Sequence, residues 1–292
     1  MSKIAVIVDS SSYIPEDLKN AYGIYEIPVP ILFDGKIKYD TDWKSPAKFY
    51  ADMNKAKTAP TTSQSSPADM NDMFERVEKD GYDEAIMITL SSGISGFYQT
   101  AVNMANQYEG NLKVTVWDSL ITVIAAGQQA LLAAEMATQN KSMDEILAKL
   151  EILRSSTRVY LVVDDIQHLK RTGRLSGGMA IVAGVLSIKP ILTFTQEGKI
   201  EAVGKERKMN RAFNWIQNKL TEYLAETKTP TRIIVADANN EEVAQEWVDA
   251  TREKYPDMPI DRGVIGALIG VHTGEKAVGY VMLADWKELA TN

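Results

Sequence analysis

Short runs rich in valine and isoleucine recur along the chain and predict the strands of the fold. Six of them are residues 3–8, 84–90, 112–117, 158–163, 231–236 and 277–283. The first three show little alternation between apolar and polar positions, which is typical of strands buried on both faces of a parallel sheet. We therefore expect helices to cover both faces of these strands.

Apolar residues also recur at helical spacing between and after these runs. Residues 121–139 are apolar nearly all round, which predicts a helix in the core. Residues 142–156 open with Ser142 and Glu145, a capping box that marks a helix start. Residues 209–226 and 239–255 carry the apolar stripe of amphipathic helices.

Strands and helices alternate up to about residue 155, and the order is less regular afterwards. At 292 residues the chain is longer than an average domain. We predict an α/β fold with two domains: an N-terminal three-layer α/β domain with a mostly parallel sheet (1–155) and a C-terminal mixed α/β domain (156–292). No low-complexity linker separates them, so we expect close packing.

The charge and the composition exclude some classes of partner. The formal net charge is -7 and the chain has no cysteine. An acidic protein is a poor match for nucleic acid, and without cysteine there are no disulfides or thiolate metal sites. No apolar stretch reaches the roughly 20 residues of a membrane span, and no signal peptide is recognisable. We therefore expect a cytoplasmic protein with no nucleic-acid partner.

Hydroxyl side chains cluster after predicted strands or before predicted helices. One cluster is residues 9–13, a second is "TTSQSSP" at 61–67, and a third is "SSGISG" at 91–96. In the second, Ser66, Pro67 and Asp69 have the pattern of a capped helix start. Helix starts bind anions, and ligands of open α/β sheets collect at the strand ends, so these hydroxyls suggest a carboxylate or phosphate site. The simpler alternative is that they only cap helices.

Nucleophilic catalysis by one of these serines is a second possibility. Phe97 stands where the G-x-S-x-G elbow would have its last glycine, so the match around Ser95 is incomplete. A serine hydrolase acting on acyl esters would use Ser92 or Ser95 with His272 as its base. Phosphate-loop, dinucleotide-binding and metal-ligand motifs are absent from the sequence, so we expect no cofactor and no metal.

Two further groups have both a structural and a functional interpretation. Lys170, Arg171 and Arg174 lie around two glycine turns and would be a solvated face, unless they serve an anion. Residues 177–192 mix small and large apolar side chains, which is typical of ordinary core but could leave room for a chain-shaped ligand. His272 lies between two glycines and is either a structural residue or a donor to a carboxylate.

Seven ordered blocks resemble a known family. The blocks are "VDSSSYIPED", "TTSQSSP", "LSSGISGFYQTA", "VWDSLITVIAAG", "LKRTGRLSGG", "LSIKPILTFTQEGKI" and "IGVHTGEKAVGY", and they cover almost the whole chain. The sequence resembles the DegV family, which is similar to the fatty-acid-binding subunits of the bacterial fatty acid kinase. The resemblance implies a long-chain fatty acid held in a tunnel between the two domains.

The resemblance also implies roles for individual residues. Thr62 and Ser92 would hold the carboxylate, with Ser63, Ser91 and Ser95 beside them and His272 nearby. Arg207 and Arg174 would present the head group to a kinase. In such systems the binding protein is not the catalyst: a separate ATP-using subunit related to dihydroxyacetone kinases phosphorylates the acid. The carrier then delivers the acyl phosphate for phospholipid synthesis, with transient contact to a membrane or an acyltransferase.

Three positions depart from the family pattern. Ser65 replaces a usual proline, Phe97 replaces a usual threonine, and Glu275-Lys276 replaces a usual proline-glycine. The last change alters the charge near the expected entrance, so it bears on the pairing with a kinase more than on acid binding. A binding module for a small phosphorylated ligand is the remaining alternative, because it would share the anion site and need no apolar tunnel.

Overall fold

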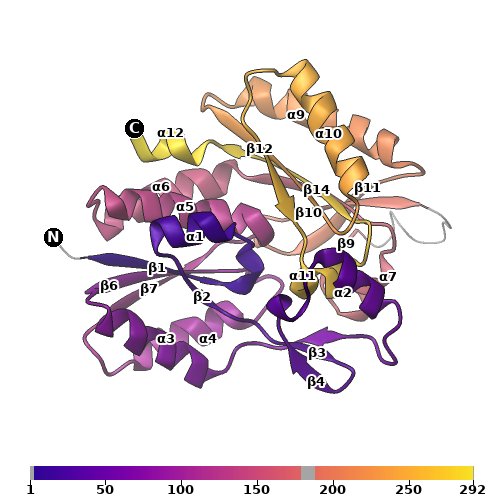
Figure 1. Ribbon diagram of the computed structural model, residues 1–292. Coiled ribbons are helices and arrows are strands. Elements are labelled where there is room, and N and C mark those ends of the chain that lie inside the picture. Colours follow the sequence, from indigo (N-terminus) through magenta and orange to yellow (C-terminus); the bar gives the residue numbers. More distant parts are fainter. Residues whose placement is uncertain (1–2, 179–187, 292) are drawn as a thin grey trace.

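A four-stranded parallel sheet forms the centre of the N-terminal half (Figure 1). The computed structural model describes residues 3–178 and 188–291. The strand order is β2-β1-β6-β7, with β1 at Ile4–Asp9, β2 at Tyr25–Ile27, β6 at Glu84–Thr89 and β7 at Lys113–Asp118. Every pairing in this sheet is parallel, so all four carboxyl ends lie at one edge.

Helices cover both faces of this sheet, as the unbroken apolar strands predict. Ile4, Val6 and Val8 pack in one cluster with α5 (Val123–Thr138) and α6 (Met143–Ser156). Ala5 and Ile7 point to the other face, where they pack with α3 (Pro67–Lys79) and α4 (Phe97–Gln107). The short α1 (Glu16–Tyr22) lies beside α5. The three-layer arrangement follows from alternate side chains of each strand pointing to opposite faces.

A seven-stranded mixed sheet forms the centre of the C-terminal half. Its order is β13-β12-β14-β8-β10-β11-β9. The strands are β8 (Arg158–Val162), β9 (Leu175–Gly177), β10 (Lys189–Phe194), β11 (Ile200–Glu206), β12 (Thr231–Asp237), β13 (Ile260–Val264) and β14 (Val278–Ala284). On one face, α9 (Met209–Glu226) and α10 (Glu241–Lys254) complete a separate apolar cluster.

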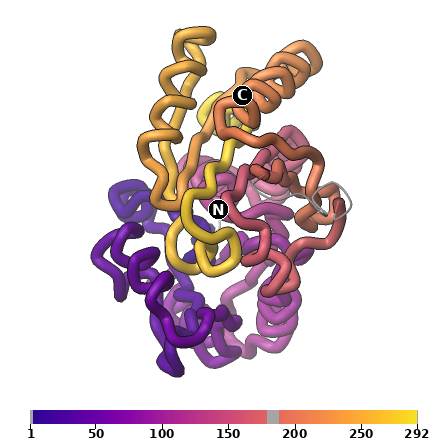
Figure 2. The backbone as a smooth tube through the Cα atoms, turned by 90° about the vertical axis from the view of Figure 1, so that its right-hand side faces the viewer, coloured from indigo at the N-terminus to yellow at the C-terminus, as the bar shows by residue number. Residues whose placement is uncertain are grey.

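The other face of this second sheet packs against α5, which therefore contacts both sheets. Buried residues occupy every side of α5, and Ile234, Val281 and Leu283 of the second sheet belong to the same cluster. Figure 2 shows the C-terminal half stacked above the N-terminal half. The predicted core helix is confirmed, and it is apolar all round because it lies between two sheets rather than on one.

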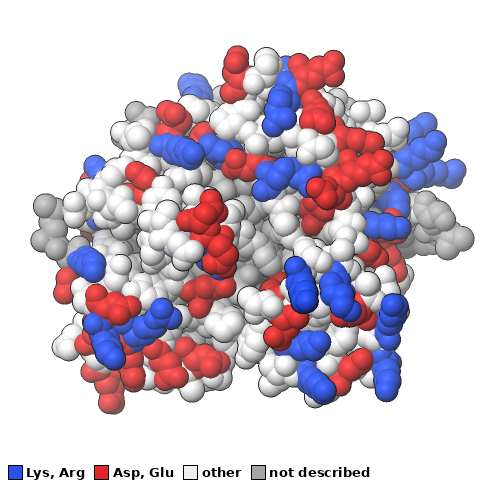
Figure 3. Space-filling view, viewed as in Figure 1, with Lys and Arg blue, Asp and Glu red and all other residues white. Residues whose placement is uncertain are grey.

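A third, three-stranded sheet of order β4-β3-β5 lies at the edge of the N-terminal half. Its strands are β3 (Ile31–Phe33), β4 (Lys36–Lys38) and β5 (Thr61–Thr62). Asp34 and Gly35 both have positive φ, at 47° and 78°, which is the backbone of a tight hairpin turn. Lysine and arginine side chains gather on this part of the surface, at the lower right of Figure 3.

The remaining helices are short and lie near the ends of the larger strands. They are η1 (Ser10–Ser12), η2 (Asp40–Asp42), α2 (Pro46–Met53), α7 (Gln167–Arg171), α11 (Ala267–Thr273) and α12 (Trp286–Thr291). Within residues 3–178 and 188–291, no helix combines the length and the apolar character needed to cross a bilayer.

The fold class predicted from the sequence is confirmed. All six predicted strands are present, as β1, β6, β7, β8, β12 and β14, and capping boxes are formed at Ser66 and Ser142. The strands of the third sheet were not among the predicted elements, and neither were β2, β9, β10, β11 and β13. The domain boundary near residue 155 stays a prediction, and of the small-residue segment 177–192, positions 179–187 lie outside the described residues.

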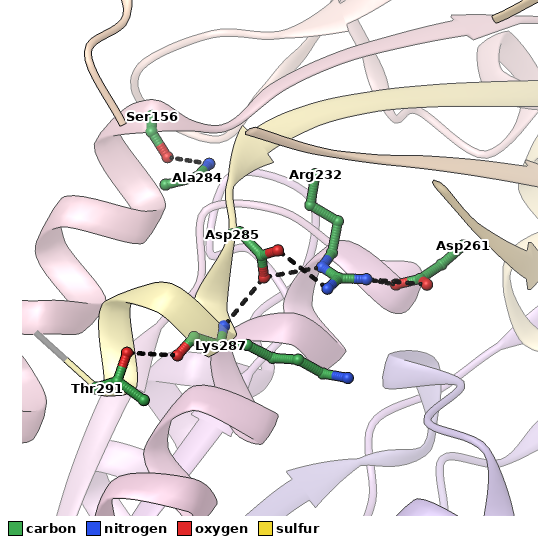
Figure 4. Close-up of polar contacts among 7 residues, drawn as sticks. All are labelled: Ser156, Arg232, Asp261, Ala284, Asp285, Lys287 and Thr291. Carbon is green, nitrogen blue, oxygen red and sulfur yellow. Dashed lines mark hydrogen bonds and ion pairs between the residues drawn. The ribbon is translucent and has the colours of Figure 1, made fainter. Parts of the chain in front are cut away.

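A buried arginine joins β12, β13 and the start of α12 (Figure 4). The Nε and Nη2 atoms of Arg232 donate to the two carboxylate oxygens of Asp285 at 3.0 and 3.1 Å, and Nη1 donates to Asp261 at 2.9 Å. Arg232 and Asp285 are both almost fully buried. Asp285 also accepts from the Lys287 N–H, so this cluster attaches the C-terminal helix to the sheet.

We expect Arg232→Met to lower the free energy of unfolding by about 3–5 kcal/mol, because it leaves the buried Asp285 carboxylate without its cation. Arg252→Met is the matched control, since Arg252 forms an exposed pair with Asp249 at 3.7 Å and should lose less than about 1 kcal/mol. Urea denaturation of both variants checks this. Equal losses would show that the Arg232 cluster does not stabilise the fold.

Candidate functional site

A cavity of about 320 Å³ lies between the two large sheets, beside the first turn of α5. Most of the residues around it are apolar, and they come from both halves of the chain. The walls include Leu90, Ile121, Ile124, Ala125, Val159, Leu161, Phe194, Ile200, Ala236, Ile265, Leu268, Ile269 and Val281. Such a cavity suits a ligand with a substantial apolar part.

Polar side chains also line the cavity, and we call the group around Thr62 and His272 its polar end. Thr62 of β5 and His272 of α11 form a hydrogen bond of 2.9 Å between Oγ1 and Nε2. Ser63 follows Thr62, and Ser95 lies just before α4; both also line the cavity. Arg174 lines it too and is close enough to influence the titration of His272. The hydroxyls of Thr62, Ser63 and Ser95, one imidazole and one guanidinium thus line the same cavity.

Two carboxylates at the edge of the parallel sheet position the loop that carries the serines. Asp9, at the end of β1, accepts from the Leu90 N–H at 2.7 Å. Asp118, at the end of β7, accepts from the Ser92 N–H at 3.1 Å. Burial raises the pKa of Asp9, and its hydrogen bonds with Ser11 and Leu90 oppose that shift. The loop after β6 is therefore held from both neighbouring strands.

Ser91 joins this loop to the second sheet and is not part of the cavity lining. Its buried hydroxyl donates to the Gly198 carbonyl at 2.7 Å, in the turn between β10 and β11. A side chain on Gly93 would meet the Gly198 backbone at 2.4 Å, so Gly93 is required for this close approach. The resemblance implies that Ser91 lies beside the ligand. In the structure its hydroxyl contacts the Gly198 carbonyl instead.

The predicted site residues therefore fall into two groups. Ser92 is exposed, and Arg207 is exposed just after β11; neither lines the cavity. The residues that do line it are Thr62, Ser63, Ser95, Arg174 and His272.

Although α11 belongs to the C-terminal half, N-terminal residues hold it in place. The Tyr50 hydroxyl donates to the Ile265 carbonyl at 2.9 Å, and Gly270 lets the Tyr50 ring pack directly on the helix. The Asp40 carboxylate accepts from the Leu268 N–H at 3.3 Å and from the Tyr13 hydroxyl at 3.1 Å. These contacts fix the helix that carries His272 against the strand that carries Thr62.

Glu275, one of the departures from the family pattern, makes a similar connection. Its carboxylate accepts from Asn54 at 3.0 Å and from Asn239 at 2.6 Å. The loop after α11 is thereby attached to the residue that follows α2.

His272 is neutral at physiological pH. Burial, together with the nearby charges of Arg174 and Arg171, lowers its pKa to about 4. Its Nδ1 atom is buried and has no hydrogen-bond partner among the described residues. A serine hydrolase needs its histidine bonded to a serine on one side and to an acid on the other. Here the observed partner of Nε2 is Thr62, so the described residues do not assemble that triad.

Some residues around the cavity were not singled out from the sequence. Gln64 accepts from the Thr100 hydroxyl at 2.7 Å and packs against Gly96, where a side chain would meet it at 2.4 Å. Leu120 and Val123 have φ of 56° and 59° at the start of α5, and Val123 lines the cavity. Gln64 could have been predicted as a site residue because it belongs to the block "TTSQSSP". The turn at Leu120 and Val123 could not, because positive φ is rare for such residues, above all for a β-branched one, and no sequence pattern indicates it.

No group of three or more His, Asp or Glu side chains within residues 3–178 and 188–291 is arranged to hold a metal ion. The polar lining residues named above supply hydroxyls, one imidazole and one guanidinium.

Comparisons with known proteins agree with this architecture. Residues 3–285 match the family model described as an uncharacterised protein of the DegV family. A DegV domain-containing protein of Listeria monocytogenes is 35% identical over 277 residues, which cover 95% of this chain and 97% of the relative.

Solved structures are similar over nearly the full length. The crystal structure of DegV, a fatty acid binding protein from Bacillus subtilis, has a TM-score of 0.88 and 33% identity, covering 97% of this chain and 100% of that one. A DegV family protein from Thermus thermophilus, described by its fatty acid binding, has a TM-score of 0.87 and 28% identity at the same coverage.

We expect Asp40→Asn to change how the stability depends on pH. Burial raises the pKa of Asp40 from 3.8 to about 6. Between these values the folded protein binds the proton more tightly than the unfolded chain, so the contribution of Asp40 to stability is lost as pH rises through about 6. The variant cannot ionise there, and its stability relative to the parent should increase from pH 4 to pH 7.

Urea denaturation across this pH range measures the effect, with the exposed Asp257→Asn as the control. Parallel stability curves for Asp40→Asn and the parent would contradict the prediction.

Proposed function

The chain belongs to the DegV family, and on that premise we propose that it binds a long-chain fatty acid in the cavity between its two sheets. The carboxylate lies at the polar end, and the acyl chain lies along the apolar walls formed by α5, β8 and β14. The observation that carries this proposal is that one cavity combines mostly apolar walls with a small polar group, in which Thr62 and His272 are hydrogen-bonded to each other.

The head group is bound through Thr62, Ser95 and Arg174. Since His272 is neutral, it carries one ring proton, and with that proton on Nε2 it donates to Thr62 Oγ1. The Thr62 hydroxyl proton is then free to point at a carboxylate oxygen. Ser95 accepts from the Phe97 N–H at 3.2 Å, which leaves its own proton available for the same purpose. We assign the second hydroxyl contact to Ser95 rather than to Ser92 because Ser95 lines the cavity.

The acyl chain provides most of the binding free energy. Each CH₂ group removed from water contributes about 0.8 kcal/mol, and part of the total is offset by the loss of freedom of the chain on binding. A small phosphorylated ligand would leave the apolar walls without a partner. The fatty acid binding described for the relatives from Bacillus subtilis and Thermus thermophilus supports the same choice of ligand.

We further propose that the protein does not catalyse a reaction on this acid but presents it to a separate kinase subunit. That subunit uses ATP, resembles dihydroxyacetone kinases, and phosphorylates the bound carboxylate. The carrier then takes the acyl phosphate toward phospholipid synthesis. The family resemblance supports this role, as does the position of Arg207, which is exposed outside the cavity and free to meet a partner's phosphate groups.

Mass spectrometry of the organic extract of the purified protein tests the ligand class, and we expect a long-chain fatty acid. Thr62→Val and Ser95→Ala should each weaken fatty acid binding by about 1–3 kcal/mol, because each removes a hydrogen bond to a charged group. Ser92→Ala is the matched control and should bind as the parent does. An extract without an acyl chain, together with no uptake of added fatty acid, would refute the proposal. Weaker fatty acid binding by Ser92→Ala alone would show that the head group binds at Ser92 instead.

The role of the arginines is tested by measuring phosphorylation of the bound acid by the kinase subunit. Arg207→Ala should keep the fatty acid affinity of the parent and lower the phosphorylation rate about tenfold or more, since an arginine contact to phosphate is a strong charge-assisted bond. Arg174→Ala should weaken fatty acid binding as well. Arg252→Ala, on the exposed side of α10, is the control. An unchanged rate with Arg207→Ala would exclude Arg207 from the presentation of the head group.

A further inference from the structure

The hairpin of β3 and β4 presents apolar side chains to solvent. Among the described residues, five large hydrophobic side chains are exposed, and three of them are on or next to this hairpin: Leu32 at 47%, Ile37 at 67% and Tyr39 at 37%. Leu32 and Ile37 are directly opposite each other in the strand register, so their side chains lie together on one face. The exposed apolar surface is therefore a contiguous pair rather than scattered single residues.

The opposite face of the hairpin is fixed in the core, so this pair is held outward. Ile31 and Phe33 are buried, and the Phe33 ring packs on Trp43 at 5.5 Å between centroids. Trp43 packs in turn on Phe49 at 5.0 Å. Turning Leu32 and Ile37 inward would require a shift of register, which these buried aromatic contacts prevent.

Lysines surround the pair, although the chain as a whole is acidic. Residues 36–57 contain six lysines and neither arginine nor glutamate, in a chain with a net charge of -7. The lysines are Lys36, Lys38, Lys44, Lys48, Lys55 and Lys57. Asp34 accepts from the backbone N–H groups of Lys57 and Thr58, at 3.1 and 3.2 Å, which brings the second part of this segment to the hairpin turn. Figure 3 shows the resulting basic area over α2 and the hairpin.

The three aspartates of the same segment each have a hydrogen-bond or ion-pair partner. Asp42 accepts from the Tyr39 N–H, Asp40 is bound to α11, and Asp52 pairs with Lys48. Lys36, Lys55 and Lys57 are exposed. The patch formed by Leu32, Ile37, Lys36, Lys55 and Lys57, which we call the hairpin patch, therefore has an apolar centre and a positive rim.

From this arrangement we propose that the hairpin patch docks the protein on the surface of an anionic phospholipid bilayer. Long lysine side chains bind lipid phosphates while the two apolar side chains enter the interfacial region. The apolar pair is too small to anchor a stable protein interface, which buries about 800 Å² on each partner. It is sufficient for weak, reversible membrane contact, and the acidic remainder of the surface orients the molecule by repulsion.

Docking at this patch would leave only the small sheet between the lipid and the head-group end of the cavity. Leu32 pairs with Thr61 in the same small sheet, and the next residue, Thr62, points to the opposite face and lines the cavity. The docking surface itself is independent of the proposed ligand, because it is defined by other residues. Vesicle binding can therefore be measured without fatty acid, and its outcome is separate from that of the extraction experiment.

The test is co-sedimentation of the full chain with vesicles of phosphatidylcholine mixed with phosphatidylglycerol, against vesicles of phosphatidylcholine alone. We expect binding to the anionic vesicles, decreasing with added salt. The apolar variant Leu32→Ser with Ile37→Ser and the charge variant Lys36→Gln, Lys55→Gln with Lys57→Gln should each lower the partition coefficient about tenfold or more.

Matched controls alter the same types of residue elsewhere. Ile152→Ser removes an exposed apolar side chain from α6, and Lys208→Gln, Lys228→Gln with Lys254→Gln changes the net charge by the same amount as the charge variant. Both controls should bind as the parent does. Equal losses in patch and control variants, or equal binding to neutral vesicles, would overturn the proposal. It would also be overturned if the patch variants lost binding to the kinase subunit while keeping vesicle binding. The charge variant leaves the apolar core untouched, so it decides the question should the apolar variant fold poorly.

Discussion

The sharing of α5 by two sheets is the constraint on which the rest of the structure depends. A helix that is apolar all round can be buried only if neighbours cover every side, and here the parallel sheet covers one side and the mixed sheet the other. The two halves are therefore held together along most of this helix. The cavity lies at its beginning, where Ile121, Ile124 and Ala125 line open space and the backbone turns through positive φ at Leu120 and Val123.

The polar end of the cavity is assembled from segments that are far apart in sequence. Thr62 comes from a two-residue strand, Ser95 from the loop before α4, and His272 from a helix near the C-terminus. Three carboxylates connect them: Asp9 and Asp118 hold the serine loop, and Asp40 holds α11. Desolvation raises the pKa of Asp9 and of Asp40, so burial of these carboxylates costs stability at neutral pH, and the hydrogen bonds that they accept offset part of this cost while they fix the geometry. The native state is therefore less stable at neutral pH than it would be without these buried charges, but the hydrogen-bond donors of the site are held in place before a ligand binds.

Local patterns in the sequence account for most of the fold and for only part of the site. Long apolar strands and capped helices were predictable because each is specified by its own residues. The small sheet was missed, since strands of two or three residues have no measurable period, although the Asp34-Gly35 pair is a recognised hairpin signal. The longer strands β10, β11 and β13 were missed as well. The three serines of the "SSGISG" loop show the limit most clearly. Ser91 points to Gly198, Ser92 to solvent and Ser95 to the cavity, and these directions depend on long-range contacts with Asp9, Asp118 and the turn of the second sheet.

The charge of the side chains that line the cavity determines whether the phosphate group of a phosphorylated fatty acid could lie inside it. Arg174 is the one cationic side chain among the described lining residues, and its field helps to keep His272 neutral. One fixed positive charge and two hydroxyls match a carboxylate, which carries one negative charge. An acyl phosphate carries more charge, and the low dielectric of an apolar cavity would make the excess unfavourable. On the proposed function the phosphate group therefore lies outside, in solvent, while the acyl chain stays buried. Retention of the product would then depend on the chain, and its release on contact with a surface that can accept an acyl group.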